Sequence, residues 1–83
     1  MDSLDENYRK SLDEVKKIRN VNNETRLKLY GLFKQIQFGD CRVKKPRFYD
    51  QKGVKKWEAW EKLKGKDKNH CKKEYIEIVA KLK

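Results

Sequence analysis

Proline and glycine are scarce in this chain of 83 residues, which has one proline and four glycines. Folds built of short strands need these residues at their turns, so the scarcity favours an all-α fold. No run approaches the ~18 apolar residues of a membrane span. The acidic, polar start (Met1 to Glu6) is unlike a secretory signal or a mitochondrial presequence. We therefore expect a cytoplasmic protein of one domain, residues 1–83.

Reactive and metal-ligating side chains are also few. Cys41, His70 and Cys71 do not have the spacing of a zinc site, and two cysteines make a poor disulfide framework, so we expect reduced thiols. His70 and Cys71 are adjacent, and adjacent residues on a helix point apart, which argues against a nucleophile and base pair. We expect no enzyme activity, no metal and no cofactor.

Positive charge, by contrast, is abundant. Lys and Arg number 23 against 13 Asp and Glu, a net charge of +10, while hydrophobic residues make up 36%. Residues 1–19 are charge-balanced, so the excess lies beyond Arg19. A charge of this size implies an anionic partner, such as nucleic acid, a membrane surface or a phosphorylated small molecule.

Apolar periodicity and capping residues predict four helices. Ser3 begins a capping box before an amphipathic stripe that runs through Arg19. Asn22 or Asn23 caps a second helix, which ends at Gly39 and is apolar around more of its circumference than a surface helix needs. That excess indicates a ligand or a second packing face.

Residues 40–49 lack helical periodicity and contain the proline, so we expect a long loop. Asp50 then caps a third helix that runs to Gly65, and Asp67 caps a fourth that runs to Leu82. Long and short connections between four amphipathic helices predict a four-helix bundle.

Several aromatic residues have two interpretations. Trp57 and Trp60 are three residues apart, as expected for core anchors. Tyr75 fits equally the core or a ligand contact. Tyr30 and Lys34 are one turn apart beside Phe33, an arrangement that suits an anionic, partly aromatic ligand such as a nucleotide, although an exposed Lys is the simpler interpretation of spacing alone.

The densest basic segment is residues 41–56, with seven bases against Asp50 alone. Together with Phe48 and Tyr49, which can stack on bases, it is compatible with a basic helical nucleic-acid-binding module. A solubilising surface is the other interpretation, because no helix-turn-helix, zinc-finger or RNP pattern is present. A peripheral membrane or scaffold module of a longer chain is a third possibility.

A set of motifs spread along the chain resembles the acyl-coenzyme A binding protein family. The motifs are Tyr30-Gly31-Leu32-Phe33-Lys34-Gln35, Gly39-Asp40, Pro46, Gly53-Val54-Lys55-Lys56-Trp57-Glu58-Ala59-Trp60, Leu63-Lys64-Gly65 and Tyr75-Ile76. The likeness covers the chain from about Leu4 to Leu82. It implies an up-down-down-up four-helix bundle with the long loop between the second and third helices.

The resemblance also implies a ligand, fatty acyl-CoA, and the residues that hold it. Coenzyme A contacts fall on Lys16, Tyr30, Phe33, Lys34, Lys56 and Tyr75. By this resemblance, Lys34 and Lys56 hold the ribose 3′-phosphate and Phe33 stacks on adenine. Tyr30 and Tyr75 flank the head group, and the acyl groove is lined by Leu12 and Leu27.

The expected function is therefore a monomeric intracellular carrier that binds long-chain acyl-CoA and delivers it to acyl-using enzymes, with no nucleic acid as partner. Three features depart from the family pattern: residue 33, the first connection and the net charge, which is far more positive than is typical. Position 33 is Phe where Tyr is common, which keeps stacking but loses a hydroxyl contact. The connection between the first two helices is shorter and lacks proline, which affects the position of Lys16. The large net charge suggests transient contact with acidic membranes.

Overall fold

Four helices and no strand make up residues 3–83, the part of the chain that this computed structural model describes. Residues 1 and 2 of the expected domain lie outside that part. The helices are α1 (Leu4–Val15), α2 (Asn23–Phe38), α3 (Gln51–Glu61) and α4 (Lys68–Leu82). The four predicted caps are confirmed, since a side-chain oxygen of each residue accepts a hydrogen bond from the backbone N–H three positions on: Ser3, Asn22, Asp50 and Asp67.

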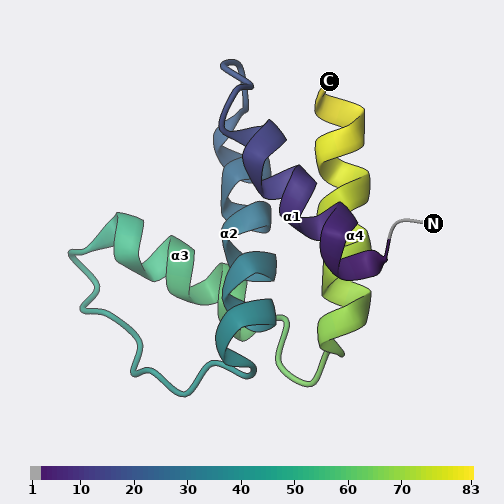
Figure 1. The fold of residues 1–83 in the computed structure, drawn as a ribbon. Helices are drawn as coiled ribbons and strands as arrows, with labels where there is room; N and C mark the ends of the chain where they lie inside the picture. Colours follow the sequence, from purple (N-terminus) through teal and green to yellow (C-terminus); the bar gives the residue numbers. More distant parts are fainter. Residues whose placement is uncertain (1–2) are drawn as a thin grey trace.

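The helices form the predicted up-down-down-up bundle with a long loop between α2 and α3 (Figure 1). α2 descends through the centre and packs against both α3 and α4, while α1 crosses α4. Gly39 has a φ of 79°, which only glycine adopts without strain, and it turns the chain out of α2 into the loop. The molecule is a thin plate with extents of 44 × 29 × 14 Å.

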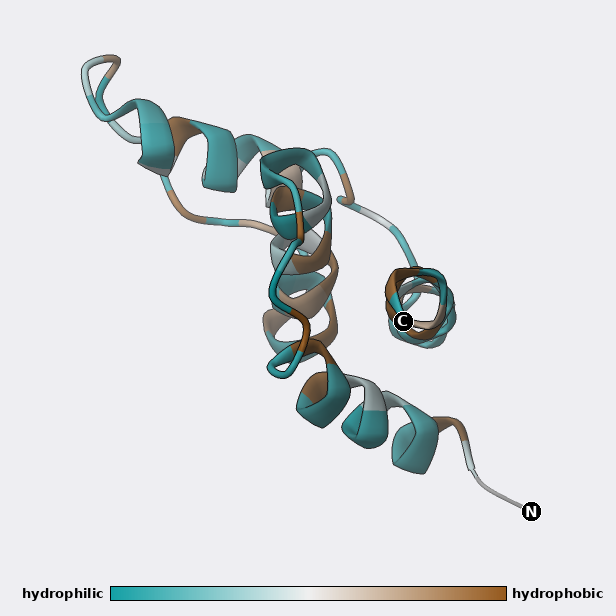
Figure 2. Cartoon of the chain, turned by 90° about the horizontal axis from the view of Figure 1, so that it is seen from above, coloured by the Kyte–Doolittle hydropathy of each residue, from teal (hydrophilic) through white to brown (hydrophobic). Residues whose placement is uncertain are grey.

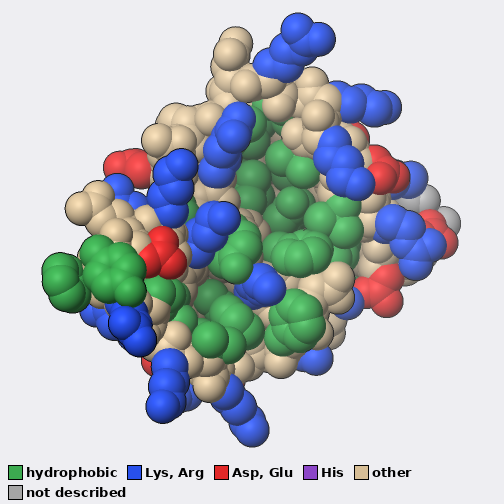
Figure 3. Space-filling view, turned by 90° about the vertical axis from the view of Figure 1, so that its left-hand side faces the viewer, with side chains coloured by type: hydrophobic (Ala, Val, Ile, Leu, Met, Phe, Trp, Pro, Cys, Tyr) green, Lys and Arg blue, Asp and Glu red, His purple; other side chains and the backbone are tan. Residues whose placement is uncertain are grey.

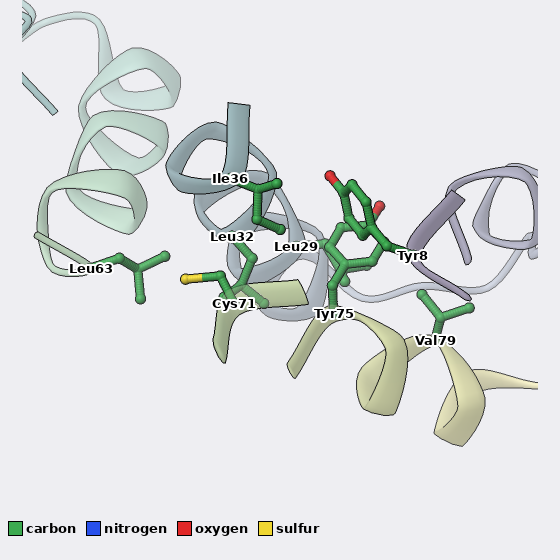
Figure 4. Packing of buried hydrophobic residues seen from close by; sticks show 8 residues of the cluster. All are labelled: Tyr8, Leu29, Leu32, Ile36, Leu63, Cys71, Tyr75 and Val79. Carbon is green, nitrogen blue, oxygen red and sulfur yellow. The ribbon is translucent and has the colours of Figure 1, made fainter. Parts of the chain in front are cut away.

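Apolar faces of α1, α2 and α4 meet in one core (Figure 4). Its members are Tyr8, Leu29, Leu32, Ile36, Leu63, Cys71, Tyr75 and Val79. Viewed along α4, hydrophobic residues lie on the side turned toward the other helices and hydrophilic residues point outward (Figure 2). Cys41 and Cys71 are both buried as free thiols. Within residues 3–83, no helix is long and apolar enough to cross a membrane.

Two helices end earlier than their apolar stripes predict. α1 stops at Val15 and not near Arg19, because the N–H of Ile18 bonds to the Val15 carbonyl, three residues back, at 3.2 Å. This tighter turn still lets Ile18 pack against the core. α3 likewise stops at Glu61 before a run of such turns, and these place Leu63 in the core with 7% of its surface exposed.

The two tryptophans differ from the expectation that both are core anchors. Trp60 is buried, and its indole N–H donates to the Gly39 carbonyl at 2.8 Å. Trp57 is only half-buried, and its indole N–H donates to the carbonyl of Val43 in the loop at 2.6 Å. Each tryptophan therefore fastens one point of the long loop to α3.

Candidate functional site

Two lysine ammonium groups lie over one tyrosine ring. The Nζ atoms of Lys34 and Lys56 are 5.7 and 5.6 Å from the centre of the Tyr30 ring. Lys34 follows Tyr30 by one turn of α2, whereas Lys56 comes from α3, so the packing of α2 against α3 creates the pair. The structure thus brings together three of the residues that the resemblance assigns to the ligand.

Aromatic rings, and not carboxylates, surround the Lys34 ammonium. Its Nζ lies 4.7 Å from the centre of the Phe38 ring and 5.5 Å from that of Trp60, in addition to Tyr30. Within residues 3–83, neither Lys34 nor Lys56 forms a salt bridge. Cation–π contacts hold an ammonium group in place and leave its N–H donors unneutralised. The arrangement is an electropositive site prepared for an anion.

A groove of about 320 Å³ lies next to the lysine pair. Its lining residues come from α1, the connection after α1, α2 and α4: Val15, Ile18, Val21, Arg26, Leu29, Tyr30, Phe33 and Tyr75. Figure 3 shows hydrophobic side chains across the hollowed middle of this face, with Lys and Arg side chains around it. Tyr30 belongs to both the groove and the lysine pair, so the apolar and the cationic surfaces are continuous.

The sequence allows Tyr75 to be either a core residue or a ligand contact. In the structure it is a core residue that also lines the groove. Only 5% of its surface is exposed and its ring packs edge-on against Tyr8, with centroids 5.3 Å apart, yet it also lines the groove. Burial raises the pKa of Tyr75 and, with a smaller contribution from Tyr75 itself, raises the pKa of Tyr8 to about 12. Both side chains are neutral at physiological pH, and burial extends that neutral state to higher pH.

A buried glutamine, Gln35, holds the C-terminal end of α2 in place. It directly follows Lys34 in the sequence. Gln35, with 2% of its surface exposed, donates through Nε2 to Asp40 Oδ1 at 2.8 Å and to the Lys66 carbonyl at 3.1 Å. The same oxygen of Asp40 accepts the backbone N–H of Gly65 at 2.8 Å, and these hydrogen bonds lower the pKa of Asp40. The network ties α2 to the connection between α3 and α4.

Three of the expected contacts, Lys16, Leu12 and Leu27, belong neither to the lysine pair nor to the groove beside it, although Leu27 shares a recess with Lys56. Lys16 is the exposed residue after α1, next to the groove residue Val15. Leu12 is half-buried and packs against the core. Leu27 lines a different recess of about 520 Å³ between α2 and the start of α3, whose other lining residues are polar: Asn23, Arg26, Gln51, Lys52, Lys55 and Lys56. Leu12 and Leu27 do not share a groove in this structure.

Five residues line the groove but were not predicted from the sequence as ligand contacts: Val15, Ile18, Val21, Arg26 and Leu29. Val15 is the last residue of α1 and Ile18 continues its apolar stripe beyond the helix, which is a usable signal. An isolated Val21 among asparagines is a weaker one. Nothing in the local sequence distinguishes Arg26 from the other bases.

The site combines three features: ammonium groups without a salt bridge, the aromatic ring of Phe33 and an apolar groove. A nucleotide joined to an apolar chain carries all three complementary parts. Within residues 3–83, no group of three or more His, Cys, Asp or Glu is placed to hold a metal ion. The chemistry of the site is recognition by charge, stacking and apolar contact.

Comparison with known proteins gives the same ligand class. Residues 5–79 match the family model described as acyl-CoA binding protein. An acyl-CoA-binding protein homologue of Drosophila melanogaster is 39% identical over 77 residues, which cover 92% of this chain and 90% of that protein. The crystal structure of acyl-CoA-binding protein 2 of Oryza sativa superposes with a TM-score of 0.90 at 32% identity, covering 96% of this chain and 90% of that one.

Some relatives are much longer. The acyl-CoA-binding domain-containing protein 6 homologue of Dictyostelium discoideum is 44% identical over 63 residues, which cover 76% of this chain but 22% of that protein. The chain spans less than a third of the length of several relatives of this kind.

Proposed function

The chain belongs to the acyl-CoA-binding protein family, and from that premise we propose that it binds long-chain fatty acyl-CoA without covalent bonds and acts as a carrier and buffer for it. The observation that supports this most directly is the pair of unneutralised ammonium groups, Lys34 and Lys56, on the Tyr30 ring. In this proposal the protein is a cytoplasmic monomer without enzyme activity. It exchanges its ligand with acyl-using enzymes and makes transient contact with acidic membranes.

Each part of the ligand has a partner in the proposed complex. Lys34 and Lys56 hold the ribose 3′-phosphate as two point charges. A lysine ammonium is suited to this role, because it is a compact charge and cannot form a bidentate pair with phosphate. Phe33 stacks on the adenine, and Tyr30 and Tyr75 flank the head group and the start of the acyl chain. Lys16, one residue beyond α1, reaches the remaining phosphates.

The acyl chain lies on the apolar surfaces that adjoin this cation site. Leu29 and Phe33 form one wall of the groove, and Leu27 extends the apolar surface toward α3. Leu12 contributes indirectly, because it packs against the core residues that support the groove. Each buried methylene contributes about 0.8 kcal/mol, and each charge-assisted hydrogen bond to phosphate about 1.5–3 kcal/mol. After the costs of association, these terms are compatible with roughly nanomolar to micromolar binding.

The phosphate assignment is tested by removing one charge and one phosphate in turn. Lys34→Ala and Lys56→Ala are each expected to weaken binding of palmitoyl-CoA by about 1.5–3 kcal/mol in titration calorimetry. With palmitoyl-dephospho-CoA, which lacks the 3′-phosphate, the same substitutions are expected to cost much less. Lys73→Ala is the matched control, because Lys73 is exposed on α4, away from the site. A Lys34→Ala penalty that persists without the phosphate refutes the assignment.

The ligand class is tested by ranking competitors in one buffer. Palmitoyl-CoA is expected to bind far more tightly than palmitate or a single-stranded oligonucleotide at physiological salt, because only it engages both the lysine pair and the apolar groove. A nucleic-acid-binding module gives the reverse order, with the oligonucleotide ahead of palmitoyl-CoA, and that order overturns the proposal.

A further inference from the structure

The loop between α2 and α3 displays large apolar side chains to solvent. Phe48 has 90% of its surface exposed, Tyr49 66% and Val43 59%. Phe48 and Tyr49 pack edge to face, with ring centroids 5.6 Å apart at an interplanar angle of 77°, and so form one paired projection. None of these residues lines the groove of the candidate site. Exposed apolar clusters of this kind mark interaction surfaces.

Hydrogen bonds anchor the segment that carries this pair. Trp57 binds the Val43 carbonyl, and the N–H of Asp50 donates to the Arg47 carbonyl at 2.9 Å. Asp50 also caps α3 immediately after the aromatic pair. Phe48 and Tyr49 are therefore held between two fixed points, and their exposure is a property of a defined loop conformation.

Bases surround the aromatic pair on both sides in sequence: Arg42, Lys44, Lys45, Arg47 and Lys52. The two acids of this region have internal partners. Asp40 accepts hydrogen bonds from Gln35 and Gly65, and Asp50 accepts one from the Gly53 N–H. Arg47 remains beside the pair, with Nη1 donating to the Tyr49 hydroxyl at 3.4 Å. The surface that the loop presents is thus aromatic at its tip and cationic around it.

We propose that residues 42–52, with Phe48 and Tyr49 at the tip, dock this protein onto the surface of an anionic phospholipid bilayer. An apolar ring that is almost fully exposed gains by entering the acyl boundary, and tyrosine suits the adjoining interface because its ring is apolar and its hydroxyl polar. Lys44 and its basic neighbours meet the anionic head groups, whose attraction extends about one Debye length. This surface also accounts for positive charge that one acyl-CoA does not require.

A nucleic acid fits the same surface less well. Single-stranded bases stack on the open faces of aromatic rings, but the edge-to-face arrangement of Phe48 and Tyr49 presents no shared platform. Phe48 has no polar group to contact a base edge, whereas a lipid interface requires none. A bilayer accepts a projecting apolar tip directly, and this favours the membrane over the nucleic acid.

The docking surface and the ligand site are connected through α3. Trp57, which holds the loop by its indole N–H, directly follows Lys56 of the lysine pair. Hydrophobic side chains also project at one edge of the face that Figure 3 shows, beside the hollowed middle of that face. This inference rests on the membrane contact in the proposed function and assigns it to the loop. Docking by the loop does not require a bound acyl-CoA, so it is tested on the ligand-free protein, and its failure leaves the proposed acyl-CoA binding untouched.

The first experiment is cosedimentation with vesicles of phosphatidylcholine alone and of phosphatidylcholine mixed with phosphatidylserine. The protein is expected to bind only the mixed vesicles, and less tightly as salt increases. Phe48→Ala is expected to weaken binding roughly tenfold, as partial burial of one phenyl ring implies. Because Phe48 is exposed, the melting curve of the Phe48→Ala variant is expected to stay unchanged. Its affinity for palmitoyl-CoA without vesicles is expected to stay unchanged as well.

Charge is tested by a matched pair of lysines. Lys44→Ala, in the loop, is expected to weaken binding to mixed vesicles about fivefold, since one base near an anionic surface has an effect of that order. Lys73→Ala removes the same charge from α4, on the opposite side of the molecule (Figure 1), and is expected to change binding little. Equal losses for the two variants mean diffuse attraction by net charge, and they overturn the assignment to the loop.

Insertion is measured with Phe48→Trp and vesicles that contain brominated phosphatidylcholine. The new indole is expected to be quenched well beyond the background of Trp57 and Trp60 in the parent protein. Absence of binding to mixed vesicles, or quenching no greater than that background, overturns the proposal. So does an oligonucleotide affinity that exceeds the vesicle affinity and falls with Phe48→Ala.

Discussion

Replacement of Gly31 by alanine tests how α2 and α3 are held together. A Cβ built on Gly31 lies 2.3 Å from the Ala59 carbonyl oxygen and 2.7 Å from its carbon, and 3.3 Å from Leu63 Cδ1. The first two atoms belong to the backbone of α3, so no side-chain rotation relieves the overlap. In Gly31→Ala, α3 must move away from α2 to restore ordinary contact.

The cost follows from two opposing effects. Alanine is favoured over glycine in a helix interior by about 1 kcal/mol. Overpacking in a well-packed contact costs about 1–3 kcal/mol and more where backbone must shift, as it must here. The packing of Ala59, Trp60 and Leu63, all buried, is lost in part when α3 moves. We therefore expect a net destabilisation of about 2 kcal/mol, or a melting temperature roughly 8–16 °C lower for a domain of this size.

The assay is urea and thermal unfolding followed by circular dichroism, together with palmitoyl-CoA titration. Affinity is expected to fall as well, because Tyr30 and Lys34 stand on α2 while Lys56 stands on α3. Gly53→Ala is the control, since its Cβ meets only the side chain of Asp50, which can rotate. It is expected to be nearly neutral, with a weakened cap offset by helix propensity. A Gly31→Ala variant as stable as the parent refutes the close contact.

Three further predictions follow from the packing and electrostatics. Trp60→Ala is expected to cost about 3–5 kcal/mol in urea unfolding, and Trp57→Ala only about 1–2 kcal/mol, because Trp57 is half-buried and has one hydrogen bond to lose. Equal costs contradict the assigned roles. Tyr8→Phe is expected to leave stability unchanged or raised at pH 7, since the buried Tyr8 hydroxyl has no hydrogen-bond partner among residues 3–83. The pKa of Tyr8 is about 12 in the folded chain against 10.0 for the free side chain. Because burial penalises the phenolate, the free energy of unfolding is unaffected by the ionisation of Tyr8 below pH 10 and falls as the pH rises from 10 toward 12, and Tyr8→Phe is expected to reduce this alkaline loss. A Tyr8→Phe variant with the parent's alkaline curve argues against this. Finally, palmitoyl-CoA affinity measured by calorimetry is expected to fall with ionic strength, because Lys56 is exposed and screened by salt; a salt-independent affinity contradicts the cation site.

The parts of the fold that local sequence controls are the parts that sequence predicted. Helix starts depend on one side chain and a backbone N–H three residues away, so Ser3 and Asp67 are readable as caps. The ends of α1 and α3 depend on the core that the chain turns toward, which is why both came earlier than predicted, that of α3 four residues before Gly65. By spacing alone, Trp57 and Trp60 are equal candidates for the core. Only the position of the loop in the folded chain distinguishes the half-buried Trp57 from the buried Trp60.

The same division applies to the candidate site. Tyr30 and Lys34 share a helix face, so their proximity is visible in sequence, whereas the approach of Lys56 needed either the resemblance or the structure. The lining of the groove is non-local: Val21 and Tyr75 are far apart in sequence, and only the packing of the helices places both along the groove. Periodicity could not reveal that Tyr75 is both core and wall.

The thinness of the molecule gives the groove an unusual relation to the core. The shortest extent of the fold is 14 Å, about half of the next, 29 Å, so the core lies close to the surface. Leu29 and Tyr75 therefore serve at once as interior residues and as groove wall. An acyl chain lying there becomes a further layer of the interior, and its contacts count toward folding as well as toward affinity. Release of such a ligand removes these contacts, so we expect the ligand-free protein to be the less stable form.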